Sequence, residues 1–200
     1  MDNNNINVDN IKKELKDLSA ALGSYKTESW NQFPAIDLYM DQVITYLERL
    51  LNIFGDTSDS GKTITSSMVN NYVKEGYLKR PVNKKYDRVH LISLYIMSML
   101  KPILPIPLIA RSLGNFSNED EYRNFYSELT SLQDQAFNSV SQKLLTLIEN
   151  ISEEDYENSL RLFALQLSSE ANAHRIAAEK IMSLLNENEA SNKNDKGKSK

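Results

Sequence analysis

Apolar residues recur at spacings of three and four along most of the chain, which is the pattern of amphipathic helices. The pattern is longest over residues 118–150 and again after residue 152, where it persists for several heptads. Shorter helices are predicted over residues 9–22, 37–54, 66–75, 88–101 and 106–113. The chain is therefore expected to be mainly α-helical.

Capping residues and turn formers predict where these helices begin and end. The side chains expected to cap helix N-termini are those of Asp37, Thr65, Asn118 and Ser152. Gly76 is expected to end the helix over 66–75, and residues 55–62 read as a loop. Residues 77–87 read as two very short strands around a turn. The tail, 188–200, is rich in Asn, Ser, Lys and Gly and is predicted to be disordered.

Composition excludes many enzyme classes. The 200-residue chain has no cysteine, which excludes a disulfide scaffold, a thiol nucleophile and a thiolate-held metal cluster. It has two histidines, His90 and His174, and no glycine-rich phosphate loop. We therefore expect a non-enzymatic binding protein with no metal and no cofactor.

Nothing in the hydropathy pattern indicates a membrane protein. The N-terminal residues are polar and lack the apolar core of a signal peptide. The uncharged run over residues 91–100 is too short to span a bilayer. A cytoplasmic location without membrane contact is predicted.

The chain has a net charge of −4, but its basic and acidic residues are distributed unevenly along the sequence. Residues 61–111 carry nine basic and two acidic residues, whereas residues 112–190 carry five basic and fourteen acidic residues. A basic segment inside an acidic chain is typical of a surface that binds a polyanion. It is also consistent with a basic face that pairs with the acidic flanks, and charge alone leaves both interpretations open.

A short helix with a polar face, then a basic hairpin, then an apolar helix is the order of a winged helix-turn-helix. Asparagine pairs with adenine, and serine and lysine suit base edges and phosphates in the major groove. The residues expected to read the major groove are Ser66, Ser67, Asn70, Asn71 and Lys74. The residues expected to hold phosphates are Lys79, Arg80, Lys84, Lys85 and Arg88.

Two stretches resemble regulators of the MerR type. Residues 72–78, Tyr-Val-Lys-Glu-Gly-Tyr-Leu, look like the end of their recognition helix. Residues 84–91, Lys-Lys-Tyr-Asp-Arg-Val-His-Leu, look like their wing exit, with His90 where that pattern has aspartate. Together with residues 39–47 and 68–74, this stretch is similar to an uncharacterised bacterial family, domain-of-unknown-function family 1836, over about residues 30–140. The resemblance implies a MerR-like DNA-binding domain and carries no established function.

The predicted organisation has four parts. They are an N-terminal helix and loop (1–36), a MerR-like winged helix-turn-helix (37–114), a long antiparallel helical hairpin (115–187) and a disordered tail (188–200). We expect a sequence-specific transcriptional regulator that binds double-stranded DNA and forms a homodimer through the C-terminal helices.

Two other functions stay open at this point. In the first, the protein is a non-enzymatic adaptor whose basic hairpin docks an acidic partner. In the second, it is a regulator gated by an unidentified small-molecule effector in an apolar pocket. Trp30 and Phe33 are expected either to cover the core or to line such a pocket.

Overall fold

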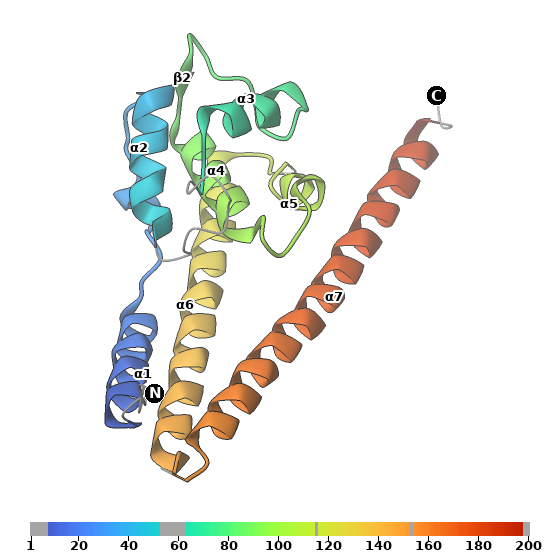
Figure 1. Cartoon of the computed structure of the whole chain (residues 1–200). Helices are drawn as coiled ribbons and strands as arrows, with labels where there is room; N and C mark the ends of the chain where they lie inside the picture. The colour runs from blue at the N-terminus through green and yellow to red at the C-terminus, as the bar shows by residue number, and fades with distance from the viewer. Residues whose placement is uncertain (1–7, 53–62, 115, 153, 198–200) are drawn as a thin grey trace. The chain divides into compact units, whose positions relative to one another are not determined.

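The computed structural model describes residues 8–52, 63–114, 116–152 and 154–197, with residues 186–197 described by their backbone alone. The described residues are mainly helical (Figure 1), which confirms the prediction from apolar spacing. The elements are α1 (Val8–Ser24), the 3-10 helix η1 (Trp30–Gln32), β1 (Leu38–Tyr39), α2 (Met40–Leu51), α3 (Ser66–Lys74), β2 (Lys85–Tyr86), α4 (Arg88–Leu100), α5 (Ile106–Ser112), α6 (Glu119–Asn150) and α7 (Tyr156–Gly197).

The chain divides into two compact units. One comprises Met1–Thr27 and Asn124–Asn172, and the other comprises Glu28–Arg123 and Ala173–Lys200. We call the first the helical unit and the second the basic unit. The basic unit holds all of the segment 61–111 in which basic residues outnumber acidic ones.

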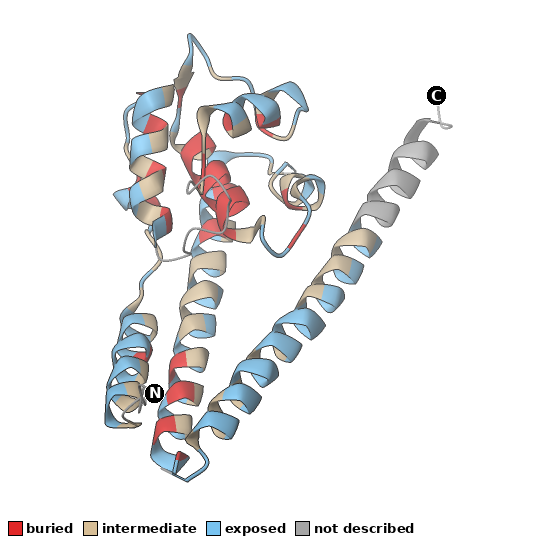
Figure 2. Ribbon diagram, in the orientation of Figure 1, coloured by how far each residue is buried: buried red, intermediate tan, exposed pale blue. Residues whose placement is uncertain are grey.

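Helix α4 forms the centre of the basic unit, and Figure 2 shows it as the most continuously buried helix. Its buried side chains include those of Leu91, Ile92, Leu94, Tyr95, Ile96 and Met97. Helices α2 and α5 and strand β2 pack against it, so it needs no polar face. Burial of each such large side chain contributes about 1.5–3 kcal/mol. None of the helices in the described residues combines the length and apolar character that a bilayer span requires.

The loop that precedes α2 carries two aromatic residues into this core. The ring of Phe33 lies between those of Tyr46 and Tyr95, with centroid distances of 5.7 and 5.9 Å. Trp30 meets the ring of Tyr122 edge-on at 5.9 Å. Phe33 and Trp30 are both buried and pack against aromatic rings of the core, which is the first of the two predicted roles.

Helix α2 begins later than its apolar pattern suggests. Asp37 does not cap it, because Leu38 and Tyr39 are held extended as β1 and the helix starts at Met40. The Gln42 Oε1 atom accepts a hydrogen bond from the Tyr39 backbone N–H at 2.9 Å and closes the first turn instead. Residues 53–54 and the predicted loop over 55–62 lie outside the described residues.

The segment 77–87 contains the predicted turn but only one of the two predicted strands. Only Lys85–Tyr86 is a strand, β2, and it pairs antiparallel with β1, placing Leu38 opposite Tyr86 and Tyr39 opposite Lys85. An isolated bridge joins Val82 to Lys85 across the turn. The partner of β2 lies far away in the sequence, where local patterns do not reveal it.

In the helical unit, α1 and α6 lie side by side (Figure 1) and meet through two buried serines. The Ser19 hydroxyl donates to the Ser141 carbonyl oxygen at 3.0 Å, and the Ser141 hydroxyl donates to the Ser19 carbonyl oxygen at 2.8 Å. The rings of Tyr25 and Phe137 stack beside them at 4.6 Å. These contacts fix the apolar faces of the two helices against each other.

Two details of the long C-terminal helices differ from expectation. Asn118 caps α6 as predicted, accepting from the Glu121 backbone N–H at 2.9 Å. Ser152 does not cap α7, which begins four residues later at Tyr156, because the chain first turns through Glu154 and Asp155. The backbone of α7 continues as helix to Gly197, into the segment predicted to be disordered, because extending a formed helix requires no new nucleus.

Candidate nucleic-acid interface

Helix α3 separates its apolar and polar side chains cleanly. Val69 and Tyr72 are buried against the core, and burial raises the pKa of the Tyr72 hydroxyl. The exposed side chains are those of Ser67, Asn70, Asn71 and Lys74, and Ser66 is half-buried. Four of the five residues predicted to read base edges therefore lie on one solvent-facing side of a short helix.

A capping residue defines the beginning of α3, and a left-handed glycine lies just after its end. The Thr65 hydroxyl accepts a hydrogen bond from the Met68 backbone N–H at 3.2 Å, which confirms the predicted N-cap. At the other end Gly76 has φ +76°, a left-handed conformation that glycine adopts without a steric penalty. The Tyr72 carbonyl then accepts from the backbone N–H groups of Tyr77 and Leu78, at 2.8 and 3.0 Å. The chain consequently reverses immediately after the polar face of α3.

The reversal leads into residues 79–88, which we call the basic wing. Lys79, Arg80 and Lys84 are exposed on it. Across the part of the chain that the structure describes, none of these three side chains takes part in an ion pair. Within the basic unit, no described ion pair with an acidic residue therefore neutralises these three cations.

Two other predicted phosphate ligands are partly used by the fold. The Lys85 ammonium lies 5.2 Å from the centre of the Tyr39 ring, and Lys85 is half-buried. The Arg88 Nε–H donates to the Pro34 carbonyl oxygen at 3.4 Å, and its guanidinium lies 5.9 Å from the centre of the Trp30 ring. These two cations tie the basic wing to the segment that precedes α2.

The tip of the wing is a tight turn. The Lys85 backbone N–H donates to the Val82 carbonyl oxygen at 2.9 Å. Both central residues are left-handed, with φ +51° at Asn83 and +63° at Lys84. Two successive positive φ values are typical of the hairpin turn that matches the twist of its flanking strands. The turn leaves Lys84 at the outermost point of the wing, with Val82 68% exposed beside it.

The base of the wing is closed by a histidine that the sequence does not identify as a contact. His90 is buried at the start of α4, with its Nδ1 atom 2.7 Å from the Asp87 Oδ1 atom. Its Nε2 atom lies 3.1 Å from the carbonyl oxygen of Lys79. The hydrogen bond from the His90 side chain lowers the pKa of the Asp87 carboxyl. One side chain thus bridges the residues at which the wing begins and ends.

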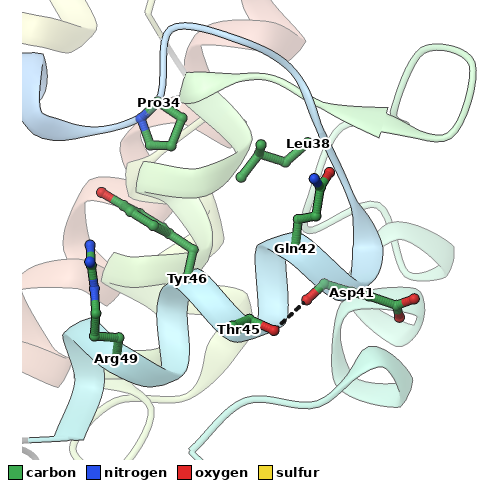
Figure 3. Close-up of a pocket in the computed structure, with 7 residues that line it drawn as sticks. All are labelled: Pro34, Leu38, Asp41, Gln42, Thr45, Tyr46 and Arg49. Atoms are coloured by element: carbon green, nitrogen blue, oxygen red, sulfur yellow. Dashed lines mark hydrogen bonds between the residues drawn. The ribbon is translucent and has the colours of Figure 1, made fainter.

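A separate groove of about 520 Å³ lies along α2 (Figure 3). Its lining residues are Pro34, Leu38, Asp41, Gln42, Thr45, Tyr46 and Arg49. The Tyr46 hydroxyl donates to the Gln32 carbonyl oxygen at 3.2 Å, and the Arg49 guanidinium lies 5.2 Å from its ring centre. Burial, together with the charge of Glu28, raises the pKa of Tyr46 to about 12. The groove contains none of the residues predicted to bind nucleic acid.

No metal site accompanies these features in the described residues, which contain no group of three or more His, Asp or Glu side chains able to hold a cation. The candidate site is a surface that combines the exposed amides of Asn70 and Asn71 with the exposed cations of Lys79, Arg80 and Lys84.

Comparison with known proteins gives one match. Neither the curated proteins nor the solved structures show a significant similarity to this chain. Residues 28–135 match the family model described as domain of unknown function DUF1836. The matched region contains the polar face of α3, the basic wing and α4, and it spans more than half of the 200 residues. The chain therefore belongs to the DUF1836 family.

Proposed function

We propose that this protein is a sequence-specific DNA-binding transcriptional regulator with a MerR-like winged helix-turn-helix, acting in the cytoplasm. In this proposal α3 enters the major groove and the basic wing contacts the flanking phosphates. The observation that carries the proposal is the chain continuity between the exposed polar face of α3 and the unpaired cations at Lys79, Arg80 and Lys84.

The electrostatics favour a polyanion as the ligand. Each Lys or Arg that neutralises a phosphate releases a condensed counterion, so unpaired exposed cations provide affinity that depends on salt. Cations already held in ion pairs would provide less. Lys79, Arg80 and Lys84 have no described ion pair within the basic unit, so these three cations are available to a polyanion.

The chemistry of α3 favours base reading in addition to backbone contact. The amides of Asn70 and Asn71 are exposed, and an Asn amide can donate to N7 and accept from N6 of adenine. Lys74 and Ser67 lie on the same exposed side and suit guanine or phosphate oxygens. A surface that bound only phosphates would need no pair of amides.

The arrangement around α3 supports a winged helix-turn-helix. Helices α2, α3 and α4 follow one another, and β2 lies between the last two. The pairing of β2 with β1 ties the wing to the start of α2, so that the wing keeps one orientation relative to that helix. A recognition helix and a wing held on one small scaffold are able to meet adjacent grooves of one duplex.

We further propose that the protein acts as a homodimer through α7. Its described side chains include none that is buried. The large apolar side chains exposed on it are Leu162, Leu165, Ile176, Ile181, Leu184 and Leu185. A second copy of α7 would cover several of these side chains, and a two-fold dimer would present two wings to an inverted repeat. Light scattering at micromolar concentration tests this, and a monomer would contradict it.

The decisive experiment is selection of genomic DNA fragments on the purified protein, followed by anisotropy titrations at several salt concentrations. We expect enrichment of one sequence, with an affinity that falls steeply as salt rises. The variant Lys79→Glu/Lys84→Glu should abolish binding. Its matched control is Lys13→Glu/Lys16→Glu, which makes the same charge change at exposed residues of α1.

Other results would reject the proposal. Equal enrichment of all fragments would show that the basic wing binds DNA electrostatically and without sequence preference. Equal loss of binding in both double variants would show that net charge alone matters. A lack of binding even at low salt would favour the adaptor, whose basic wing docks an acidic protein.

A further inference from the structure

A cavity of about 400 Å³ lies at the base of the basic wing, between the residues that follow α3, the start of α4 and the end of α5. Its volume falls within the range of about 300–1,000 Å³ that small-molecule sites occupy. Its lining residues all belong to the basic unit. Among the described residues, none lines both this cavity and the groove along α2. It is therefore a separate hollow, and it borders the wing directly.

The lining of the cavity is buried and mainly apolar on the inside. Leu78, His90 and Ser93 are only 4–7% exposed, so they form its floor. The walls are apolar and half-buried, and they consist of Val89, Ala110 and Leu113. Most of what the inside of the cavity offers to a ligand is apolar surface.

The polar groups on the floor already have partners. The Ser93 hydroxyl lies 2.9 Å from the Tyr122 hydroxyl, within hydrogen-bond distance. The His90 ring contacts Asp87 through Nδ1 and the Lys79 carbonyl oxygen through Nε2. A buried polar group that already has a partner requires none from a ligand. The part of a ligand that enters this cavity is therefore expected to be apolar.

Two side chains of opposite charge lie at the mouth of the cavity. Lys79 and Asp87 both line it and are both exposed. They flank a single imidazole ring, since the Lys79 carbonyl oxygen lies 3.1 Å from His90 Nε2 and the Asp87 Oδ1 atom lies 2.7 Å from His90 Nδ1. Among the described ion pairs, none joins the ammonium of Lys79 to the carboxylate of Asp87. Both charges are therefore available to a ligand that carries one negative and one positive group.

We propose that this cavity binds an apolar α-amino acid. Its carboxylate pairs with Lys79, its ammonium pairs with Asp87, and its side chain fills the apolar inside of the cavity. An α-amino acid carries both charges on one carbon atom beside its side chain, which matches a charged mouth above apolar walls. A ligand with the same side chain but a single charge would leave either Lys79 or Asp87 without a counter-charge.

The bound amino acid would regulate the proposed DNA binding, and this step rests on the proposed function. Lys79 is one of the three exposed wing cations expected to hold phosphates. A carboxylate paired with Lys79 removes that cation from phosphate contact, so that one counterion fewer is released when DNA binds. The amino acid should therefore weaken DNA binding and reduce the salt slope by about one.

Isothermal titration calorimetry of the full-length protein tests the site, with L-phenylalanine and L-leucine as probes. Two analogues dissect the charges, because hydrocinnamate lacks the ammonium of phenylalanine and phenethylamine lacks its carboxylate. We expect each analogue to bind about two- to fivefold more weakly than L-phenylalanine, which is the effect of one exposed ion pair. Lack of saturable binding by both amino acids at millimolar concentration would overturn the proposal. Equal binding of the three phenyl compounds would also overturn it.

Variants assign each charge to its partner. Lys79→Gln should weaken L-phenylalanine binding by about two- to fivefold and should not weaken phenethylamine binding. Asp87→Asn retains a good N-cap for α4, and it should weaken L-phenylalanine binding without weakening hydrocinnamate binding. The matched controls Arg111→Gln and Glu75→Gln remove a charge from exposed residues outside the cavity lining, and they should leave L-phenylalanine binding unchanged. Unchanged L-phenylalanine binding in both Lys79→Gln and Asp87→Asn would contradict the proposed pairing.

Anisotropy titrations of a random-sequence DNA duplex, with and without saturating L-phenylalanine, test the regulation. We expect weaker binding and a smaller salt slope with the amino acid, whereas Lys79→Gln should show the smaller slope under both conditions. Amino-acid binding by a protein that binds no DNA would support the site and reject the proposed function alone. DNA binding that L-phenylalanine leaves unchanged would overturn the regulatory step.

Discussion

Tyr39 and Lys85 are paired across the two-stranded sheet, and the Lys85 ammonium lies 5.2 Å from the centre of the Tyr39 ring. The pair joins the residue before α2 to the returning strand of the basic wing. The wing is therefore fixed to the scaffold by backbone hydrogen bonds and by a cation–π contact at the same position.

This relationship predicts different effects for two adjacent lysines. Lys85→Gln removes the contact with the Tyr39 ring and should lower the free energy of unfolding by about 0.5–1 kcal/mol. Lys84→Gln, at an exposed residue with no described ion pair, should change it by less than about 0.5 kcal/mol. Urea unfolding followed by circular dichroism measures both. Equal effects at the two positions would argue against a contribution from the ring.

Substitution by alanine should change the stability of the fold differently at two glycines that follow helices. At Gly76 the added Cβ atom meets nothing within 4 Å, but φ is +76°. Gly76→Ala should therefore destabilise the fold by about 1 kcal/mol through backbone strain alone. At Gly114 the Cβ atom would make ordinary contacts with the Ala110 and Arg111 carbonyl oxygens at 3.5 and 3.7 Å. Gly114→Ala should therefore destabilise the fold less than Gly76→Ala does. Thermal unfolding of the two variants measures this difference in stability.

If the proposed function holds, α3 and the wing should give distinct binding phenotypes. Asn70→Ala should weaken binding to the selected sequence by about 1–3 kcal/mol and relax the preference at one base pair. Lys84→Ala should weaken binding evenly across sequences and reduce the salt slope by about one. Competition titrations with single-base variants of the site measure the first effect, and a salt series measures the second. A uniform loss for Asn70→Ala would exclude base reading by that amide.

Acid should destabilise the start of α4 through Asp87. The hydrogen bond from His90 lowers the pKa of this carboxyl from its ordinary value of 3.8, so the carboxylate stabilises the folded state above that pH. The stabilisation is lost as the pH falls below 3.8 and through the lower folded-state pKa. Asp87→Asn should show a shallower loss of stability over this acidic range. Urea midpoints measured at a series of acidic pH values check this, and parallel curves for the two proteins would contradict it.

Local patterns predict the helices of this chain well, because each amphipathic helix shows its buried face in its own sequence. The exposed side of α3 is one example, since Val69 and Tyr72 alone define which residues face outward. The cap at Thr65 and the stop at Gly76 follow for the same reason.

Contacts between distant segments are not visible in such patterns. The start of α2 is displaced by a strand whose partner is Tyr86, and Arg88 is drawn inward by the Pro34 carbonyl and the Trp30 ring. The bridge from His90 to the Lys79 carbonyl depends on a backbone atom, which no side-chain motif can reveal. The sequence therefore predicts the members of the candidate site better than the contacts that position them.

The left-handed turn at Asn83 and Lys84 has a consequence for how this chain responds to selection. Glycine would adopt φ +63° without the steric penalty that a lysine side chain meets there. The protein thus keeps a cation at the outermost point of the wing at the expense of turn stability. Selection for thermostability alone is expected to replace Lys84 with glycine. Selection that also demands function is expected to retain the lysine. The identity of this residue therefore indicates which kind of selection has acted on the chain.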